Sequence, residues 1–294
     1  MAETVGGDLD RATSEFAEAR PRLFGIAYRV LGSAVDAEDL VQDVWLRWQA
    51  ADRSAVRHPA AYLATATTRL AINAGRTARA RHEVYVGPWL PEPVDTSADP
   101  QLGAEREAAL EVAVLFLLEK LTPTQRAAYV LREAFDYPYD QIADIIGASE
   151  PTARQLVSRA RRRLADERRT PVAAPEQRRL LTAFVAAARE GDLAALEELF
   201  AADVVSWSDG GGVVRASRIP VAGSVTVARY VRAFAGHFWT GVEVSWATVN
   251  GGPAAVLRRD GAVFAVLAVA ASADGIDTVF WMMNPDKLAA VGRS

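Results

Sequence analysis

Residues 140–164, DQIADIIGASEPTARQLVSRARRRL, have the pattern of a helix-turn-helix whose second helix is basic. Gly147 suits the end of the first helix, Ser149 offers a hydroxyl to cap the second, and Pro151 fits the first turn of that second helix. The second helix also carries an apolar stripe at i, i+4, i+7 and i+11 spacing, which predicts one buried face. The members of this stripe are Ala153, Val157, Ala160 and Leu164.

The opposite face of this second helix is polar and rich in arginine. At the N-terminal end of a recognition helix such residues can hydrogen-bond base edges, and later arginines can reach phosphates. The candidate DNA-binding residues are Arg154, Gln155, Ser158, Arg159, Arg161 and Arg162. Ordinary three-helix bundles contain the same pattern, and an arginine-rich face is often only solvated, so the rest of the chain has to decide between the two interpretations.

Composition restricts the class of protein. A chain of 294 residues, 50% hydrophobic and 24% charged, predicts two or three globular domains. There is no cysteine, and the three histidines lie far apart, so we expect no disulfide, no metal site and no cofactor. No apolar run reaches the roughly 18 residues of a membrane span, and the acidic N-terminus does not resemble a signal peptide. We therefore expect a cytoplasmic protein that does not bind membranes.

The net charge of −4 is unusual for a nucleic-acid-binding protein, but the charges are segregated along the chain. Residues 1–52 contain ten acids and five bases, whereas residues 53–82 contain six arginines and no acid. Residues 149–169 contain seven arginines and three acids. DNA binding depends on the local electrostatic potential of the protein surface. The two basic blocks are therefore a better indicator of DNA binding than the net charge.

Residues 10–50 are predicted to form two helices on either side of Gly32 and Ser33. The second of these helices begins with acids, which the helix dipole favours, but its acidic and tryptophan-bearing face extends further than the first turn. This face suggests a protein partner. The candidate residues are Asp36, Glu38, Asp39, Gln42, Asp43 and Trp45.

A long helix is predicted from Pro59 to about residue 81. We expect its buried stripe to contain Leu63, Ala66, Leu70 and Ala74. Another face presents polar and basic side chains three or four residues apart, which could follow phosphates or remain a solvated surface. The candidate residues on this part of the chain are Arg69, Asn73, Arg76, Arg79 and Arg81.

Residues 83–103 contain four prolines and two glycines, which indicates a linker. A purely solvated tether would not contain Tyr85, Val86, Trp89 and Leu90. We expect another surface to cover Trp89 in particular. A second helical module follows, in which Thr122 and Gln125 have the spacing of a capping box with Pro123 at the first helical position.

The last segment changes architecture. Two helices, at about 176–189 and 193–200, are separated by Gly191 and by Asp192, which can cap the second helix. One further helix is predicted at 225–235. Strands are predicted at 204–207, 213–218, 242–249, 254–259, 262–270 and 276–283. Helices followed by a meander indicate an α+β domain with a curved antiparallel sheet.

Three segments, at 32–48, 58–83 and 121–164, resemble in order regions 2 and 4 of extracytoplasmic-function (ECF) sigma factors. Residues 175–294 resemble a SnoaL-like domain of the NTF2-like fold, and the combination resembles the ECF group with a fused SnoaL-like extension. The predicted fold is therefore multidomain, with two all-α sigma regions followed by an α+β domain. The expected boundaries are 8–83 for region 2, 84–104 for the linker, 105–170 for region 4 and 175–294 for the SnoaL-like domain.

Three short signatures of that group are present in the linker, in a turn and near the end of the chain. They are Trp89-Leu90-Pro91-Glu92-Pro93, Asp209-Gly210-Gly211-Gly212 and Asn284-Pro285-Asp286-Lys287-Leu288. We hypothesise that the linker signature docks on the other two and that this interdomain contact is regulatory. The group usually has a basic residue directly after the three glycines, whereas this chain has Val213 there and Arg215 two residues later.

The resemblance implies a sigma factor that binds core RNA polymerase, with contacts to the β and β′ subunits, and directs initiation at promoter DNA. The acidic helix would dock on the β′ clamp helices, residues 53–82 would act at the −10 element, and the helix-turn-helix at the −35 element. The resemblance also implies that the extension acts in cis in place of a separate anti-sigma protein.

Two alternatives belong to other classes of protein. One is a metabolite-responsive helix-turn-helix regulator that does not engage polymerase. The other is a SnoaL-like small-molecule enzyme fused to a DNA-binding module, with Asp209, His237 and Tyr230 as candidate acid–base residues. We expect no enzymatic activity, since an Asp before glycines is also ordinary turn chemistry. A small-molecule ligand of the extension is left open.

Overall fold

A computed structural model describes the whole chain except residues 1, 97–110, 166–168, 290 and 292–294, and it leaves the side chains of residues 2–8, 80, 81 and 83 undescribed. The chain divides into two compact units. The helical unit contains residues 1–81, 100–109 and 117–166, and the sheet unit contains residues 82–99, 110–116 and 167–294. The linker up to residue 99 and residues 110–116 therefore group with the C-terminal part of the chain.

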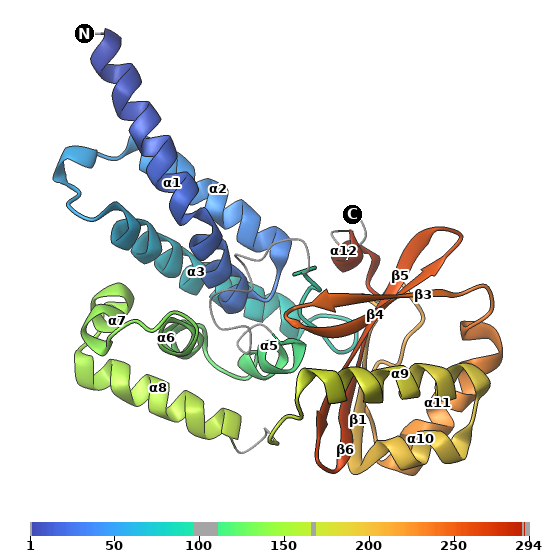
Figure 1. Ribbon diagram of the computed structural model, residues 1–294. Helices are drawn as coiled ribbons and strands as arrows, with labels where there is room; N and C mark the ends of the chain where they lie inside the picture. Colours follow the sequence, from blue (N-terminus) through green and yellow to red (C-terminus); the bar gives the residue numbers. More distant parts are fainter. Residues whose placement is uncertain (1, 97–110, 166–168, 290, 292–294) are drawn as a thin grey trace. The chain divides into compact units, whose positions relative to one another are not determined.

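The elements up to residue 165 are helical (Figure 1). They are α1 (Ala2–Leu31), α2 (Ala34–Ala50), the 3-10 helix η1 (Arg53–Ala55), α3 (Pro59–Glu83), α5 (Val112–Leu118), α6 (Pro123–Glu133), α7 (Tyr139–Ile146) and α8 (Glu150–Ala165). Local signals set several of these ends. Ser33 caps α2 by accepting a hydrogen bond from the Asp36 amide, and Thr122 with Gln125 forms the predicted capping box of α6.

The helix-turn-helix forms as its sequence predicts. Gly147 ends α7 in the left-handed conformation at φ 68°, and the Ser149 hydroxyl accepts a hydrogen bond from the Thr152 amide at 3.4 Å. The predicted apolar stripe of α8 is buried along its whole length, with Ala153, Val157 and Ala160 fully enclosed. Helices α6, α7 and α8 pack together around this stripe.

The buried face of α3 differs from the prediction. Leu63 is buried, but Ala66, Leu70 and Ala74 are only half-buried. The residues that pack inward instead are Ala64, Thr67, Thr68, Ala71, Ile72, Gly75 and Ala78. Thr68 can lie inside because its hydroxyl donates to the Ala64 carbonyl at 2.8 Å, whereas the buried Thr67 hydroxyl has no hydrogen-bond partner in the described part of the chain.

The sheet unit consists of α-helices and one six-stranded sheet (Figure 1). Its helices are α9 (Ala174–Glu190), α10 (Leu193–Leu199), α11 (Ser224–Phe238) and α12 (Pro285–Leu288). Its strands are β1 (Phe200–Asp209), β2 (Val221–Ala222), β3 (Glu243–Val249), β4 (Gly252–Arg259), β5 (Ala262–Ser272) and β6 (Gly275–Met282). Asp192 caps α10 by accepting a hydrogen bond from the Ala195 amide at 3.1 Å, as predicted.

The strand order is β2-β1-β6-β5-β4-β3. All neighbours are antiparallel except β1 and β6, which pair in parallel, so the sheet is mixed rather than wholly antiparallel. This parallel pair is possible because the whole meander and α11 form the long connection between the two strands. The strand predicted at 213–218 is also wrong: the Gly210 carbonyl accepts hydrogen bonds from the amides of Val213 and Val214, and the chain turns there.

The two faces of the sheet are covered differently. One face packs against α9, α10 and α11, with Phe184, Val227 and Trp281 in the same apolar cluster. The other face carries Phe280 and Met282, and its cluster includes linker and C-terminal residues. Because successive side chains of a strand point to opposite faces, neighbouring residues of β1 and β6 serve different clusters. We call these the helix face and the linker face.

Candidate functional site

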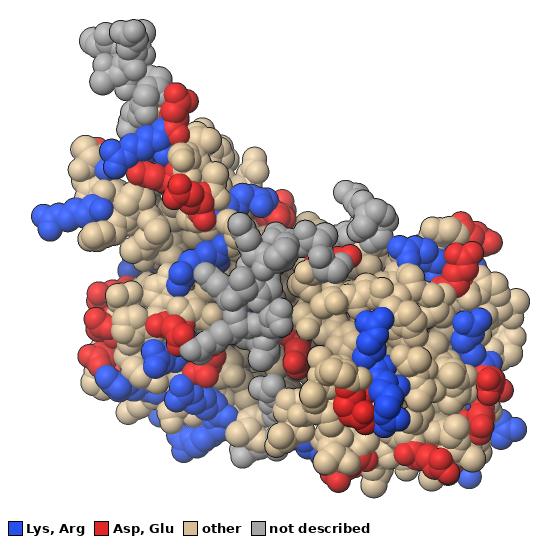
Figure 2. All heavy atoms as spheres, in the orientation of Figure 1, with Lys and Arg blue, Asp and Glu red and all other residues tan. Residues whose placement is uncertain are grey.

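The exposed surface of α8 carries the candidate −35 residues. Arg154, Gln155, Ser158, Arg159, Arg161 and Arg162 are all exposed. Figure 2 shows lysine and arginine side chains gathered over α8. The structure therefore leaves this face open to a polyanion, as a recognition helix requires.

Two of these arginines already have partners within the helical unit. Arg154 pairs with Glu150, and its guanidinium carbon lies 4.5 Å from the centre of the Tyr139 ring. Arg161 lies 2.6 Å from Glu133, and its hydrogen bond to that carboxylate raises the pKa of the guanidinium. Exposed pairs of this kind are weak, so phosphates can replace these carboxylates.

The candidate −10 residues of α3 are exposed at Arg69, Asn73, Arg76 and Arg79, whereas the side chain of Arg81 lies outside the described part. Arg69 is nevertheless engaged. Its guanidinium donates to the carbonyls of Asp144 and Ile145, at 2.8 and 2.9 Å, in the last turn of α7. A predicted −10 residue thus binds the helix-turn-helix in this conformation.

The acidic face of α2 is open for most of its length. Glu38, Asp39, Gln42 and Asp43 are exposed, and Glu38 lies 2.6 Å from Arg20. The two other candidates of this face, Asp36 and Trp45, are half-buried. The Trp45 ring packs 4.9 Å from that of Phe16, so its apolar body already has an intramolecular partner.

The structure brings together the three signature segments of the sheet unit. Asp209, at the end of β1, is fully enclosed and lies 2.7 Å from Lys287 of α12, whose side chain is 8% exposed. Between them lies Leu90 of the linker: its amide donates to Asp209 at 2.9 Å, and its carbonyl accepts from Lys287 at 2.6 Å. We call this arrangement the Asp209–Lys287 clasp.

Aromatic side chains of the linker enclose the clasp. The Lys287 ammonium lies 4.0 Å from the centre of the Trp89 ring and 5.1 Å from that of Tyr85. The Tyr85 hydroxyl donates to Asp209 at 2.6 Å and accepts from the Asn284 amide at 2.8 Å. Burial, reinforced by the Asp209 carboxylate, raises the pKa of Tyr85, so its hydroxyl remains a donor.

Two of the three glycines after Asp209 are required by close approach. A Cβ on Gly211 would lie 2.5 Å from Asn284, and one on Gly210 would lie 2.4 Å from the Val214 carbonyl. Gly211 also has a φ of 63°, which favours glycine, and its amide donates to Asp209 at 3.1 Å. Val213, where the group usually has a basic residue, is 74% exposed.

The linker continues along the sheet after the clasp. Pro91 and Pro93 are buried and Glu92 is half-buried. The Val94 amide then donates to the Asn250 side chain at 2.9 Å, and the Thr96 amide to the Thr248 carbonyl at 3.0 Å. Sequence reasoning did not single out Tyr85 as a site residue. The signal for it was an aromatic residue in a proline-rich segment, which only a covering surface can explain.

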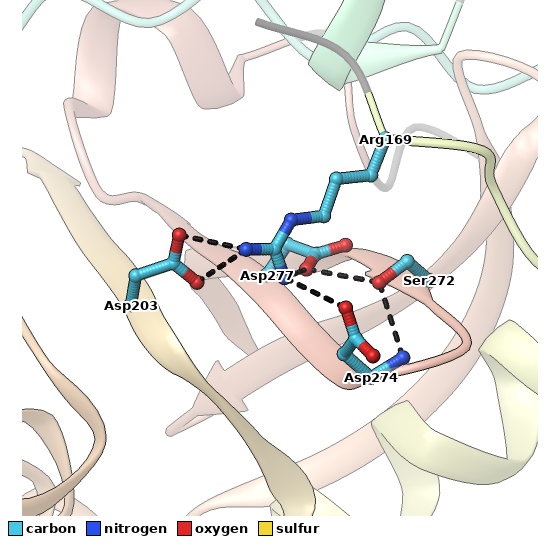
Figure 3. Close-up of polar contacts among 5 residues, drawn as sticks. All are labelled: Arg169, Asp203, Ser272, Asp274 and Asp277. Atoms are coloured by element: carbon cyan, nitrogen blue, oxygen red, sulfur yellow. Dashed lines mark hydrogen bonds and ion pairs between the residues drawn. The ribbon is translucent and has the colours of Figure 1, made fainter.

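A second polar cluster holds the chain where it enters the sheet unit. Arg169 pairs with Asp203 and Asp277 at 2.6 and 2.7 Å and with Asp274 at 3.5 Å (Figure 3). Burial raises the pKa of Asp277, against the opposing effects of Ser272 and Arg169. These residues are far apart in sequence, and none was predicted. No group of acids or histidines in the described part of the chain has the arrangement of a metal site.

The candidate acid–base residues of the enzyme hypothesis are not assembled into one site. Asp209 belongs to the clasp on the linker face, whereas Tyr230 lines a cavity on the helix face. His237 is exposed in the last turn of α11, with its ring 5.6 Å from that of Phe234. Acid–base catalysis by Asp209, Tyr230 and His237 would require these side chains to meet in one pocket, and in the described part of the chain they do not.

With this geometry in place, comparison with known proteins defines the class. Residues 16–81 match the family Sigma-70 region 2, and residues 111–164 match Sigma-70, region 4. The two helical modules are therefore those of a sigma-70-type initiation factor.

The chain is 35% identical over 234 residues to the ECF RNA polymerase sigma factor SigJ of Mycobacterium tuberculosis, covering 78% of this chain and 75% of SigJ. It is 30% identical to the probable ECF sigma factor SigI of the same species, over 95% of both chains. The crystal structure of SigJ matches with a TM-score of 0.76 and 32% identity, over 95% of this chain and 98% of that one.

The chain belongs to the family of ECF RNA polymerase sigma factors. The predicted fold class, helical sigma regions followed by a SnoaL-like α+β domain, is confirmed by the match to SigJ over nearly the whole chain. The sigma-70 regions imply RNA polymerase and promoter DNA as its partners. This family membership does not favour the alternative of a regulator that acts without polymerase. The family is not enzymatic. No helix in the described part of the chain is long and apolar enough to cross a membrane.

Proposed function

We propose that the sheet unit regulates this sigma factor in cis by holding the linker between regions 2 and 4 in one conformation. The observation that carries the proposal is that both backbone polar groups of Leu90 bind the buried Asp209–Lys287 clasp. The segments matching regions 2 and 4 end at residue 81 and begin at residue 111, so the held linker is the part of the chain that limits their separation.

We propose finer roles for the three candidate surfaces. The exposed acids of α2 bind the β′ clamp helices of core polymerase, since charge complementarity favours an acidic face against a basic one. The arginines of α3 act at the −10 element, where Asn73 can meet an unstacked base. The exposed face of α8 enters the major groove at the −35 element. The exposure of these faces supports the assignment.

We also propose that promoter binding separates two contacts made inside the helical unit. Arg69 of α3 is bonded to carbonyls of α7, and Arg126 of α6 donates to the Val30 carbonyl of α1 at 2.8 Å. The −10 and −35 elements lie about 25 base pairs apart, roughly 85 Å at 3.4 Å per base pair. Regions that reach both elements therefore have to give up these contacts.

The surface assignment is tested by Arg154→Ala and Arg159→Ala, with Arg189→Ala, an exposed arginine of α9 in the sheet unit, as the matched control. Loss of a base or phosphate contact costs about 1–3 kcal/mol, so −35-dependent transcription should fall roughly 5- to 100-fold. Core polymerase capture by the full chain should be unchanged. Normal transcription from both variants would show that a different face of α8 reads DNA.

The clasp is tested through the spacing of the promoter. Each added base pair moves the elements apart by about 3.4 Å and rotates them by roughly 35°, so a held linker should give a narrow spacer optimum. Transcription with core polymerase is measured on spacers one and two base pairs longer and shorter. Asp209→Asn should broaden the optimum, whereas Asp260→Asn, an exposed aspartate in the β4–β5 turn, should leave it as in the wild type. Equal spacer profiles for all three proteins would rule out regulation by the clasp.

A further inference from the structure

A cavity of about 190 Å³ lies on the helix face of the sheet, between α11 and the ends of β1 and β6. Aromatic side chains dominate its lining. They are Tyr230, Phe234, Phe238, Trp239 and Trp281. The Trp281 indole donates to Ser206 at 3.2 Å, so its N–H is already satisfied and the ring contributes apolar surface to the lining. Such a lining fits a flat aromatic molecule.

Polar groups at the cavity have no partner among the described residues. Ser208 lines the cavity and is 3% exposed. Its hydroxyl has no hydrogen-bond partner among the described residues, so it is available to a ligand. The Tyr230 hydroxyl is likewise unbonded within the described part of the chain. Arg215 lines the same cavity from the turn after the glycines, and no carboxylate of the described chain pairs with it. An unbonded hydroxyl, a phenol and the unpaired guanidinium of the exposed Arg215 together suit a carboxylate.

The cavity shares a wall with the linker-binding site. Ser208, Arg215, Ala216 and Ser217 line the cavity and also line a second hollow, whose other wall includes Val86 of the linker. Ser208 directly precedes Asp209 of the clasp, and the two side chains point to opposite faces of the sheet. A ligand that contacts this wall therefore touches the same short segment that holds the linker.

We propose that this cavity binds a small aromatic acid, with one ring and one carboxylate, and that its binding strengthens the hold of the sheet unit on the linker. The ring packs among the aromatic side chains, and the carboxylate accepts hydrogen bonds from Arg215, Ser208 and Tyr230. An apolar cavity of about 150 Å³ is enough for benzene, so the present volume accommodates a ring with a small substituent. The effect of the ligand on the linker rests on the proposed function, whereas binding of the acid in the cavity does not depend on it.

Binding is measured on the full chain by ligand-observed NMR with benzoate, salicylate and phenylacetate, and with benzyl alcohol as the neutral probe. At least one acid should bind more tightly than benzyl alcohol. Arg215→Gln should weaken its binding by about tenfold or more, because a charge-assisted hydrogen bond is lost. The control is Arg229→Gln, which changes an exposed arginine of α11 outside the cavity; its affinity for the acid should stay within about twofold of the wild-type value. Ser208→Ala and Tyr230→Phe should each weaken binding of the acid. Failure of all three acids at about 10 mM, equal binding of benzyl alcohol, or insensitivity to Arg215→Gln would overturn the proposed ligand class.

The effect on the linker is measured by amide hydrogen exchange of residues 90–96 with and without the bound acid. Saturation should slow exchange there by at least about threefold in the wild type and not in Arg215→Gln. Binding without any change in exchange would refute the coupling while leaving the cavity as a binding site. The proposed regulation by the clasp fails separately, through the spacer experiment, which uses no ligand.

Discussion

Replacing Lys287 by methionine tests whether the clasp holds the linker. Methionine matches the unbranched stem of lysine and lacks the ammonium, which lies 2.7 Å from Asp209 and 2.6 Å from the Leu90 carbonyl. Removing one partner of a buried ion pair costs about 3–5 kcal/mol. Asp209 keeps three donors, from Tyr85, Leu90 and Gly211, so the lower end of this range applies, about 3 kcal/mol.

This loss should appear as faster local opening of the linker. At about 1.4 kcal/mol for each tenfold change, the Leu90 amide should exchange roughly 100-fold faster in Lys287→Met than in the wild type. Hydrogen exchange of peptides covering residues 86–96 measures this in the full chain. Asp260→Asn, in an exposed turn of the same unit, should leave the rate unchanged.

A double-mutant cycle separates the pair from general damage to the sheet unit. Asp209→Asn alone leaves the Lys287 ammonium buried, whereas the double variant buries neither charge. The free energy of linker opening should therefore fall less in the double variant than the sum of its decreases in the two single variants, with a coupling energy of about 2 kcal/mol. Additive effects, or a Leu90 rate within about threefold of wild type in Lys287→Met, would show that the linker is held by apolar packing instead.

The remaining predictions concern the surroundings of the clasp. Gly211→Ala places a Cβ 2.5 Å from Asn284 at a φ of 63° and should cost about 1–3 kcal/mol in thermal unfolding, whereas Gly236→Ala, which meets no atom within 4 Å, should be tolerated. Because Tyr85 has a raised pKa in the folded state, the contribution of its neutral hydroxyl is complete below its unfolded value of about 10 and is lost as the pH rises through the folded pKa. An absorbance titration of tyrosinate should show that the phenol missing from Tyr85→Phe ionises above that ordinary value in the wild type. Arg169→Gln should speed exchange of the amides just after residue 169. It should lower the unfolding midpoint only slightly, because two of its three carboxylate partners, Asp203 and Asp274, are exposed.

Signals confined to a few consecutive residues predicted the local structure well. The capping box of Thr122 and Gln125, the cap at Asp192 and the left-handed Gly147 all depend on groups within about four residues. The buried stripe of α8 could be predicted for a similar reason, since its apolar spacing is unambiguous.

The errors arose where the outcome depends on residues distant in sequence. The inward face of α3 includes Thr67 and Thr68, because the neighbouring helices decide which side of α3 is covered. The segment at 213–218 is apolar enough for a strand, but the glycines before it impose a turn. The role of Tyr85 depends on Asp209, which is 124 residues further along the chain.

The sequence by itself was enough to identify the class of this protein, the basic face of α8 and the three signature segments at 89–93, 209–212 and 284–288. Helix periodicity, caps and turns are local physics, and they can be recognised without coordinates. Only the tertiary structure decided that Asp209 and Lys287 meet around the backbone of Leu90, and that Ser208 faces a cavity beside them. The reason is that burial of a charge pair and enclosure of a cavity are set by which surfaces the fold brings together.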